Sequence, residues 1–278
     1  MPASTEAQTV PDVGITEGLA RLRRSSKIIS RIPKSVRPLV ADSLCATLDS
    51  ALRHQTIQAW WRFFSFAFFS LRAPGKGDVG ITAAANIRRQ LSGTSPTQFH
   101  RTSSYDPPDN AARGEQHQDS DDTLARRVRG KCADGDIRAA LRLLTSDDAV
   151  AEPDPDVIAS LKQKHPAAPE DDQLPPSPSP SDPAPLTVTS AELEAAINSM
   201  PPGSSAGLDG IRPLHLRQLI SSDAAECGRR LLQSLTALTN LVLAGRMSDC
   251  RREALFGASL FALRKKSGVL RPIAVGSV

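Results

Sequence analysis

The stretch that most directly decides the fold is residues 257–276, which read GASLFALRKKSGVLRPIAVG. Apolar runs from Leu255 to Leu263 and from Val269 to Val275 flank the short segment Lys265-Lys266-Ser267-Gly268. Two such runs separated by a polar segment that ends in glycine are typical of antiparallel strands joined by a turn. The sequence therefore predicts a β-hairpin in the last part of the chain.

A helix, a glycine-rich loop and further helices are predicted immediately before this hairpin. Thr189 and Glu192 have the spacing of a capping box, and the apolar pattern that follows stops at Pro201. Residues 203–210, GSSAGLDG, contain three glycines, which allow backbone angles that other residues resist. Pro213 suits the first position of the next helix. A longer helix is then predicted from apolar residues on one face: Cys227, Leu231, Leu235, Leu238 and Val242.

This order of elements resembles the segment that opens the reverse transcriptase domain of non-LTR retrotransposons. The resemblance covers residues 186–278 and rests on Gly-x-Asp-Gly at 207–210, Ile-x-Pro at 211–213 and Arg-Pro-Ile at 271–273. In that family, an apolar strand, a basic turn and a strand with Arg-Pro-Ile form the fingers hairpin over the incoming nucleotide. The resemblance therefore implies a partial right-hand polymerase with the start of its fingers region.

The same resemblance assigns phosphate contact to basic residues of the hairpin, namely Lys265 or Lys266 together with Arg271. Lys and Arg donate charge-assisted hydrogen bonds to phosphate oxygens, which suits a nucleotide or a template backbone. The alternative is that this basic turn is only a solvated one. Within the loop we expect Gly207, Asp209 and Gly210 to have structural roles. Asp209 could cap the following helix, because one isolated carboxylate cannot hold two cations.

The carboxylates of polymerase chemistry are not predicted in this chain. The family implies a palm aspartate after the hairpin and a later Tyr-x-Asp-Asp turn, which together hold two Mg²⁺ ions. The single tyrosine, Tyr105, precedes Asp106-Pro107-Pro108, and the sequence ends two residues after Gly276. The histidines and the four cysteines lack metal-ligand spacing. We therefore expect no catalytic residue, metal site or cofactor here, and activity only in a complete polymerase.

The remainder of the chain divides by composition into five regions before the partial reverse transcriptase domain at 186–278. The fold class as a whole is mainly α with a C-terminal β-hairpin and disordered linkers. The expected regions are a disordered basic tail (1–30), a helical segment (31–72), a mostly disordered stretch with a possible short helix at Ile81–Leu91 (73–120), a small helical region (121–165) and an acidic, proline-rich linker (166–185).

The helical segment holds an unusual aromatic cluster, with seven of the 11 aromatic residues between residues 60 and 69. Rings on most sides of a helix favour a core or a protein interface over base stacking. An alternative function is nevertheless a non-catalytic nucleic-acid or protein-binding module, in which Arg53, Arg62 and Arg72 supply positive charge beside the rings. A further alternative is that the isolated chain folds poorly, because a fingers hairpin alone leaves an apolar face uncovered.

Charge and hydropathy limit the partners and the compartment. The net charge is +4 with an isoelectric point near 9.0, which suits RNA or DNA as a partner. Basic regions, with 13 basic and 6 acidic residues in 1–90, flank an acidic one, with 2 basic and 9 acidic residues in 147–182. The apolar run Trp60–Leu71 is too short to span a membrane. We expect an intracellular protein, nuclear or cytoplasmic, with reduced thiols; the sequence carries no signal for its oligomeric state.

Overall fold

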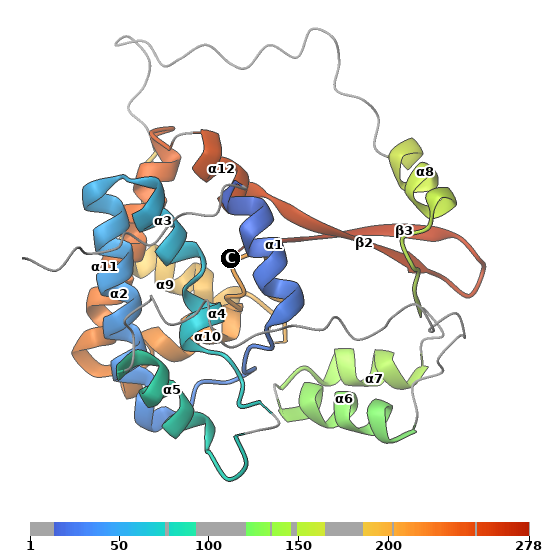
Figure 1. The fold of residues 1–278 in the computed structure, drawn as a ribbon, viewed down its shortest axis with the longest axis horizontal. Coiled ribbons are helices and arrows are strands. Elements are labelled where there is room, and N and C mark those ends of the chain that lie inside the picture. The colour runs from blue at the N-terminus through green and yellow to red at the C-terminus, as the bar shows by residue number, and fades with distance from the viewer. Residues whose placement is uncertain are drawn as a thin grey trace, which may run out of the picture.

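A computed structural model describes residues 14–75, 78–92, 121–133, 135–145, 149–164, 186–201, 203–247 and 249–277 (Figure 1). The fold is mostly helical, with a small antiparallel sheet formed near the C-terminus, as the sequence predicts. In chain order the elements are α1 (Ile15–Ser25), η1 (Lys34–Val36), α2 (Arg37–His54), α3 (Ile57–Phe64), α4 (Phe66–Ser70), α5 (Ala83–Ser92), α6 (Asp121–Ala133), α7 (Ile137–Thr145), β1 (Ala149–Val150), α8 (Pro155–Lys164), α9 (Ser190–Ser199), α10 (Pro213–Ile220), η4 (Ser222–Ala224), α11 (Ala225–Leu243), α12 (Asp249–Phe256), β2 (Ala258–Arg264) and β3 (Leu270–Gly276).

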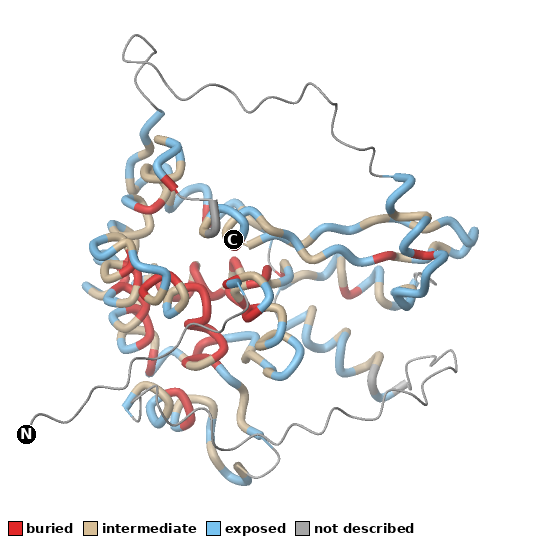
Figure 2. The backbone as a smooth tube through the Cα atoms, turned by 45° about the horizontal axis from the view of Figure 1, so that its top comes forward, coloured by how far each residue is buried: buried red, intermediate tan, exposed pale blue. Residues whose placement is uncertain are grey.

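The core of the helical body lies between α2 and α11, which come from opposite halves of the chain. Val40, Leu44 and Leu48 recur every four residues on α2 and are at most 2% exposed. They form an apolar stripe within the helical segment expected at 31–72, and Leu231 of α11 lies in the same core cluster as Val40 and Leu44. Figure 2 shows the buried positions gathered in this body and few along the hairpin. The N-terminal helices therefore pack directly on the C-terminal region.

The aromatic cluster forms part of this core, as predicted. Trp60 and Phe64 of α3, with Phe66 and Phe68 of α4, are all at most 5% exposed. The sequence predicts one helix over Ile57–Leu71, but the structure separates it at Ser65, whose hydroxyl donates to the Trp61 carbonyl over 2.6 Å. A hydroxyl that bonds back to the preceding turn bends a helix. This bend allows rings from both short helices to enter the core.

The expectation of a disordered tail over residues 1–30 is wrong for its second half. Helix α1 occupies Ile15–Ser25, and its Ile15 and Leu19 are 5% and 0% exposed. These two side chains pack in the same cluster as Trp60 and Phe64. Helix α1 has 11 residues, and its few apolar positions lie among arginines, so the sequence shows no clear helical period. Burial of its one apolar face stabilises the helix. Residues 1–13 lie outside the described ranges.

The central part of the chain follows the predicted pattern where it is described. Helix α5 corresponds to the short helix expected at Ile81–Leu91, and the remainder of the expected disordered stretch, residues 93–120, lies outside the described ranges. Helices α6 and α7 lie in the small helical region expected at 121–165 and pack against each other, with Gly135 at a φ of +77° between them. Helix α8 also lies within this small helical region. The proline-rich linker at 166–185 is not among the described residues.

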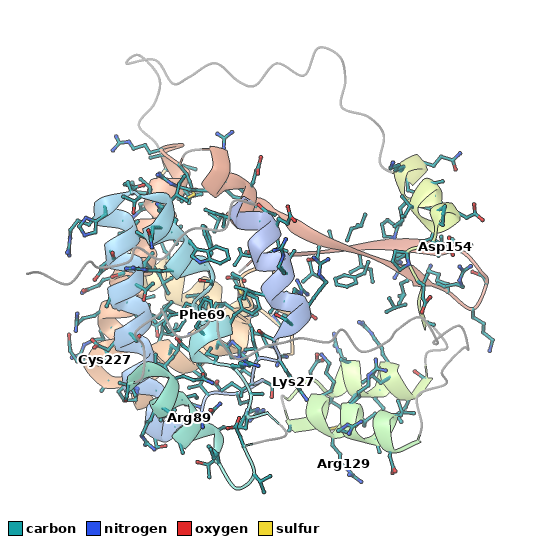
Figure 3. The ribbon with its side chains drawn as sticks, in the orientation of Figure 1. Lys27, Phe69, Arg89, Arg129, Asp154 and Cys227 are labelled. Atoms are coloured by element: carbon teal, nitrogen blue, oxygen red, sulfur yellow. The ribbon has the colours of Figure 1, made fainter. Side chains whose placement is uncertain are left out.

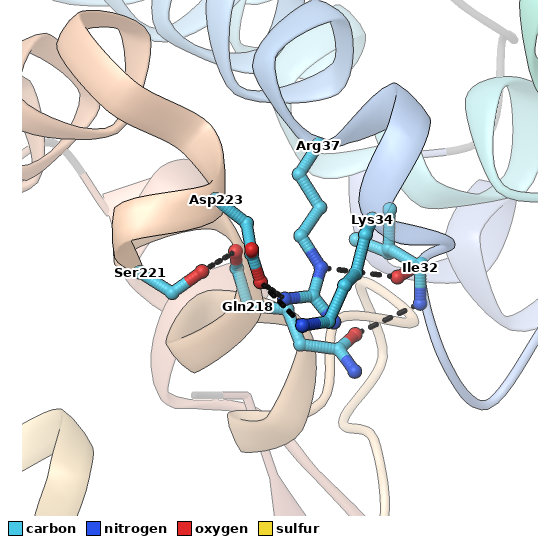
Figure 4. A network of polar contacts seen from close by, with 6 residues as sticks. All are labelled: Ile32, Lys34, Arg37, Gln218, Ser221 and Asp223. Atoms are coloured by element: carbon cyan, nitrogen blue, oxygen red, sulfur yellow. Dashed lines mark hydrogen bonds and ion pairs between the residues drawn. The ribbon is translucent and has the colours of Figure 1, made fainter.

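A polar network joins the turn before α11 to the start of α2 (Figure 4). Asp223 forms an ion pair with Arg37 and lies 3.7 Å from Lys34 Nζ. Nearby, the Gln218 side chain accepts a hydrogen bond from the Ile32 backbone N–H over 2.8 Å. Arg37 is only 12% exposed, so the carboxylate of Asp223 compensates a largely buried charge. These contacts fix the register of the two halves of the body.

The sheet projects to one side of the helical body (Figures 1 and 2). Strands β2 and β3 pair antiparallel from Ala258↔Gly276 to Arg264↔Leu270, and β1, which the sequence did not reveal, adds to the other edge of β2. The Ala262 carbonyl accepts a hydrogen bond from the Ala151 N–H over 2.8 Å. The backbone groups of Ala262 therefore point toward β1 and away from its β3 partner, Pro272. Pro272 therefore faces the free edge of β3, where its missing N–H removes no ladder hydrogen bond.

Helix α8 covers part of the hairpin. Asp154, which lies beside the hairpin in Figure 3, begins α8 by accepting from the Val157 N–H over 2.7 Å. Helix α8 contacts β3, and Val157 is 3% exposed. No helix within the described ranges is long and apolar enough to cross a membrane.

Candidate nucleic-acid interface

The predicted turn of the hairpin is present and brings the basic candidates to one end of it. Lys265 N donates to the Val269 carbonyl over 3.0 Å, and Gly268 N donates to the Lys265 carbonyl over 2.8 Å. Gly268 has a φ of +79°, which explains the glycine at this position. Lys266 is exposed in the turn, and Lys265 is half-buried. The turn therefore presents two lysines at the end of the hairpin that projects from the body.

Arg271 lies on the returning strand close to these lysines. It pairs with Leu263, the next pair after Arg264↔Leu270 at the turn. Because side chains alternate across a sheet, Arg271 shares a face with Leu263, Phe261 and Ile273. Phe261 and Ile273 are 38% and 37% exposed. The hairpin therefore carries positive charge at its tip and a partly exposed apolar face toward its base.

The glycine-rich loop packs against the base of the hairpin through backbone contacts. A Cβ atom on Gly207 would lie 2.5 Å from Ser277 N and would also overlap the Gly276 carbonyl oxygen. Gly210 has a φ of +74°, and a Cβ there would lie 3.1 Å from Phe68 Cζ. These two glycines therefore allow the loop to fit between the hairpin and the aromatic core.

Asp209 lies between the two glycines; part of the residue is exposed, but its carboxyl group is buried. Its Oδ1 accepts from the Ile211 backbone N–H over 3.2 Å, and burial raises the pKa of its carboxyl to about 7. The expectation that Asp209 caps the next helix is wrong. Helix α10 has Arg212 as its N-cap, and the His215 ring accepts from the Arg212 backbone N–H instead. The loop between Gly210 and Pro213 is too long for the carboxylate to reach the first turn of α10.

Arg23 of α1 joins the loop to the hairpin and was missed by sequence reasoning. Its Nη1 donates to the Gly207 carbonyl and to the Ser259 hydroxyl, each over 3.0 Å. Its guanidinium also lies over the Phe261 ring, 5.8 Å from the centroid. The sequence shows only a run of basic residues in an expected tail, so no local signal separates Arg23 from its neighbours.

The second candidate surface, on the N-terminal helices, is less suited to stacking. Arg53, Arg62 and Arg72 are exposed, as the alternative function requires. The rings beside them are mainly buried, however, and Trp60 is already covered by Arg251, whose guanidinium lies 5.7 Å from its ring centroid. A buried ring cannot stack on a base. These helices therefore offer positive charge rather than an aromatic platform.

The described residues do not contain a metal site: no three or more His, Cys, Asp or Glu side chains among them are placed to hold an ion together. Asp209 is an isolated carboxylate that accepts a backbone hydrogen bond. The chain matches no family model, no curated protein and no solved structure.

Proposed function

We propose that this chain forms the start of the fingers region of a reverse transcriptase of the non-LTR type. The parent activity would be template-directed DNA synthesis on RNA. One observation carries the proposal: the two motifs of the resemblance meet in space. Gly207 of the Gly-x-Asp-Gly loop packs backbone to backbone against Gly276 and Ser277, at the end of the strand that holds Arg271-Pro272-Ile273.

In this proposal the hairpin binds nucleic acid and does not itself catalyse. Lys265, Lys266 and Arg271 donate hydrogen bonds to phosphate oxygens of a nucleotide or template. The Mg²⁺ ions of a polymerase require carboxylates that are close together, and the described residues do not supply such a set. We therefore assign phosphate binding, and no chemical step, to this chain.

Phosphate contact predicts a strong dependence of affinity on salt. Each neutralised phosphate releases condensed counterions, so three contacts give a slope of roughly −2 to −3 in log affinity against log salt concentration. Fluorescence anisotropy with a labelled RNA template annealed to a DNA primer, between about 50 and about 200 mM salt, measures this slope. A wild-type chain that binds with no salt dependence would refute the proposal.

The decisive variant replaces Lys265, Lys266 and Arg271 by alanine. We expect its affinity for the primer–template to fall and its salt slope to approach zero. A matched control removes the same charge from the alternative surface, by changing Arg53, Arg62 and Arg72 to alanine. If the control loses affinity and the hairpin variant does not, the chain is instead a binding module that uses its N-terminal helices.

A further inference from the structure

We propose that Arg23 is a positioning residue that fixes the orientation of the hairpin for phosphate contact. This inference rests on the proposed function, because it concerns how the same hairpin is presented to nucleic acid. Arg23 lies on α1, outside the motifs that carry the resemblance. Within the described residues, its side chain contacts Gly207, Ser259 and Phe261 and not the basic turn itself.

The hydrogen bonds of Arg23 span the junction between the body and the hairpin. Gly207 belongs to the loop that is inserted in the helical body, whereas Ser259 is the second residue of β2. A single guanidinium nitrogen donates to both, at 3.0 Å each. Hydrogen bonds from a charged donor are about twice as strong as neutral ones. Arg23 therefore connects the base of the hairpin, at the start of β2, to the helical body.

Contact with Phe261 makes this attachment directional. Phe261 follows Ser259 by two residues, so both side chains lie on the same face of β2. The guanidinium bonds to the first and lies over the ring of the second. A contact at two successive positions on one face restrains tilt of the strand, which a single hydrogen bond cannot do.

Tilt at the base has a large effect at the tip. From Ser259 to Arg264, β2 extends five residues, or about 17 Å at about 3.3 Å per residue. A tilt of about 10° at the base would move the basic turn by about 3 Å. A displacement of about 1 Å already impairs aligned contacts. Restraint at the base therefore decides whether the turn meets phosphate in the correct geometry.

The support of Arg23 is itself rigid. Ile15 and Leu19 anchor α1 in the aromatic core, with 5% and 0% exposure. Removal of the guanidinium leaves this anchor and the close approach of Gly207 to the end of β3 in place. We therefore expect loss of Arg23 to loosen the hairpin without unfolding the body.

The test compares Arg23→Ala with Arg24→Ala, which removes the same charge from an exposed neighbour on the same helix. Amide hydrogen exchange of residues 258–276 reports the hold on the hairpin without any nucleic acid. Anisotropy with the RNA–DNA primer–template reports the positioning. For Arg23→Ala we expect about tenfold faster exchange and about tenfold weaker binding, and changes of less than about twofold for Arg24→Ala.

Equal exchange in the two variants would overturn the proposal, and so would faster exchange with unchanged affinity. A wild-type chain that does not bind the primer–template refutes the proposed function before any variant is compared, and removes the basis of the inference with it. If Arg23→Ala does not fold, Arg23→Lys replaces it. Lysine keeps the charge but lacks the planar fork, so the same directions of change are required, and wild-type values would overturn the proposal.

Discussion

Replacement of Gly207 by alanine should destabilise the junction between the loop and the hairpin. An added Cβ would lie 2.5 Å from Ser277 N, whereas ordinary contact begins at 3.4 Å. The two backbones must therefore separate by about 0.9 Å, and neither neighbour is a flexible side chain that could move aside. The φ of Gly207 is not positive, so the cost arises from overlap and not from backbone strain.

Overpacking of this kind costs about 1–3 kcal/mol of the free energy of unfolding. Urea denaturation followed by circular dichroism measures this loss, and hydrogen exchange of residues 258–276 should locate it at the hairpin. Gly130→Ala is the matched control, because a Cβ there meets nothing within 4 Å and alanine favours helix α6. The control should therefore be neutral or stabilising.

The reasoning would be refuted if Gly207→Ala unfolded at the wild-type urea concentration and its hairpin amides exchanged at the wild-type rate. That result would mean that the loop and the end of β3 do not approach each other as closely as the structure shows. It would also remove the observation on which the proposed function rests. Loss of stability with unchanged hairpin exchange would place the strain elsewhere in the loop.

Two further predictions concern charged groups. Burial raises the pKa of Asp209 from 3.8 to about 7, so the unfolded chain ionises first and this group destabilises the fold as pH rises from about 4 to about 7. The free energy of unfolding of Asp209→Asn, measured relative to wild type in urea titrations, should therefore be on the order of 2–4 kcal/mol higher at pH 8 than at pH 4. An equal difference between variant and wild type at both pH values would contradict this. Asp223→Ala should lower the free energy of unfolding by about 1–2 kcal/mol, because Arg37 is only 12% exposed and loses its carboxylate. Glu226→Ala, in an exposed pair with Arg229, should change it by less than about 0.5 kcal/mol, and similar losses in the two variants would refute this account.

Local signals in the sequence determined much of the secondary structure. The capping box at Thr189 and Glu192 begins α9, and the four-residue spacing from Val40 to Leu48 forms the buried face of α2. The β-hairpin follows from two apolar runs and the glycine at its turn. Each of these features depends on residues within one element or its immediate neighbour, so a linear pattern is sufficient to predict it.

The expectations from the sequence were wrong or incomplete where tertiary contacts override local preference. The sequence of helix α1 resembles a basic tail, but Ile15 and Leu19 are buried in a core that later residues of the chain form. Strand β1 has only two residues and exists because β2 pairs with it. The carboxylate of Asp209 was expected at a helix cap, but it is buried in the loop and accepts a hydrogen bond from the Ile211 N–H. None of these outcomes is encoded within a few residues.

The candidate site divides in the same way. Lys265, Lys266 and Arg271 are neighbours along one hairpin, so the sequence by itself determined that they lie at the same end of it. The contact that holds this hairpin joins Arg23 to Gly207 and to Ser259, which are 184 and 236 residues away. Only the tertiary structure could decide this contact, because a hydrogen bond between distant segments depends on how the helices pack and leaves no period in the sequence.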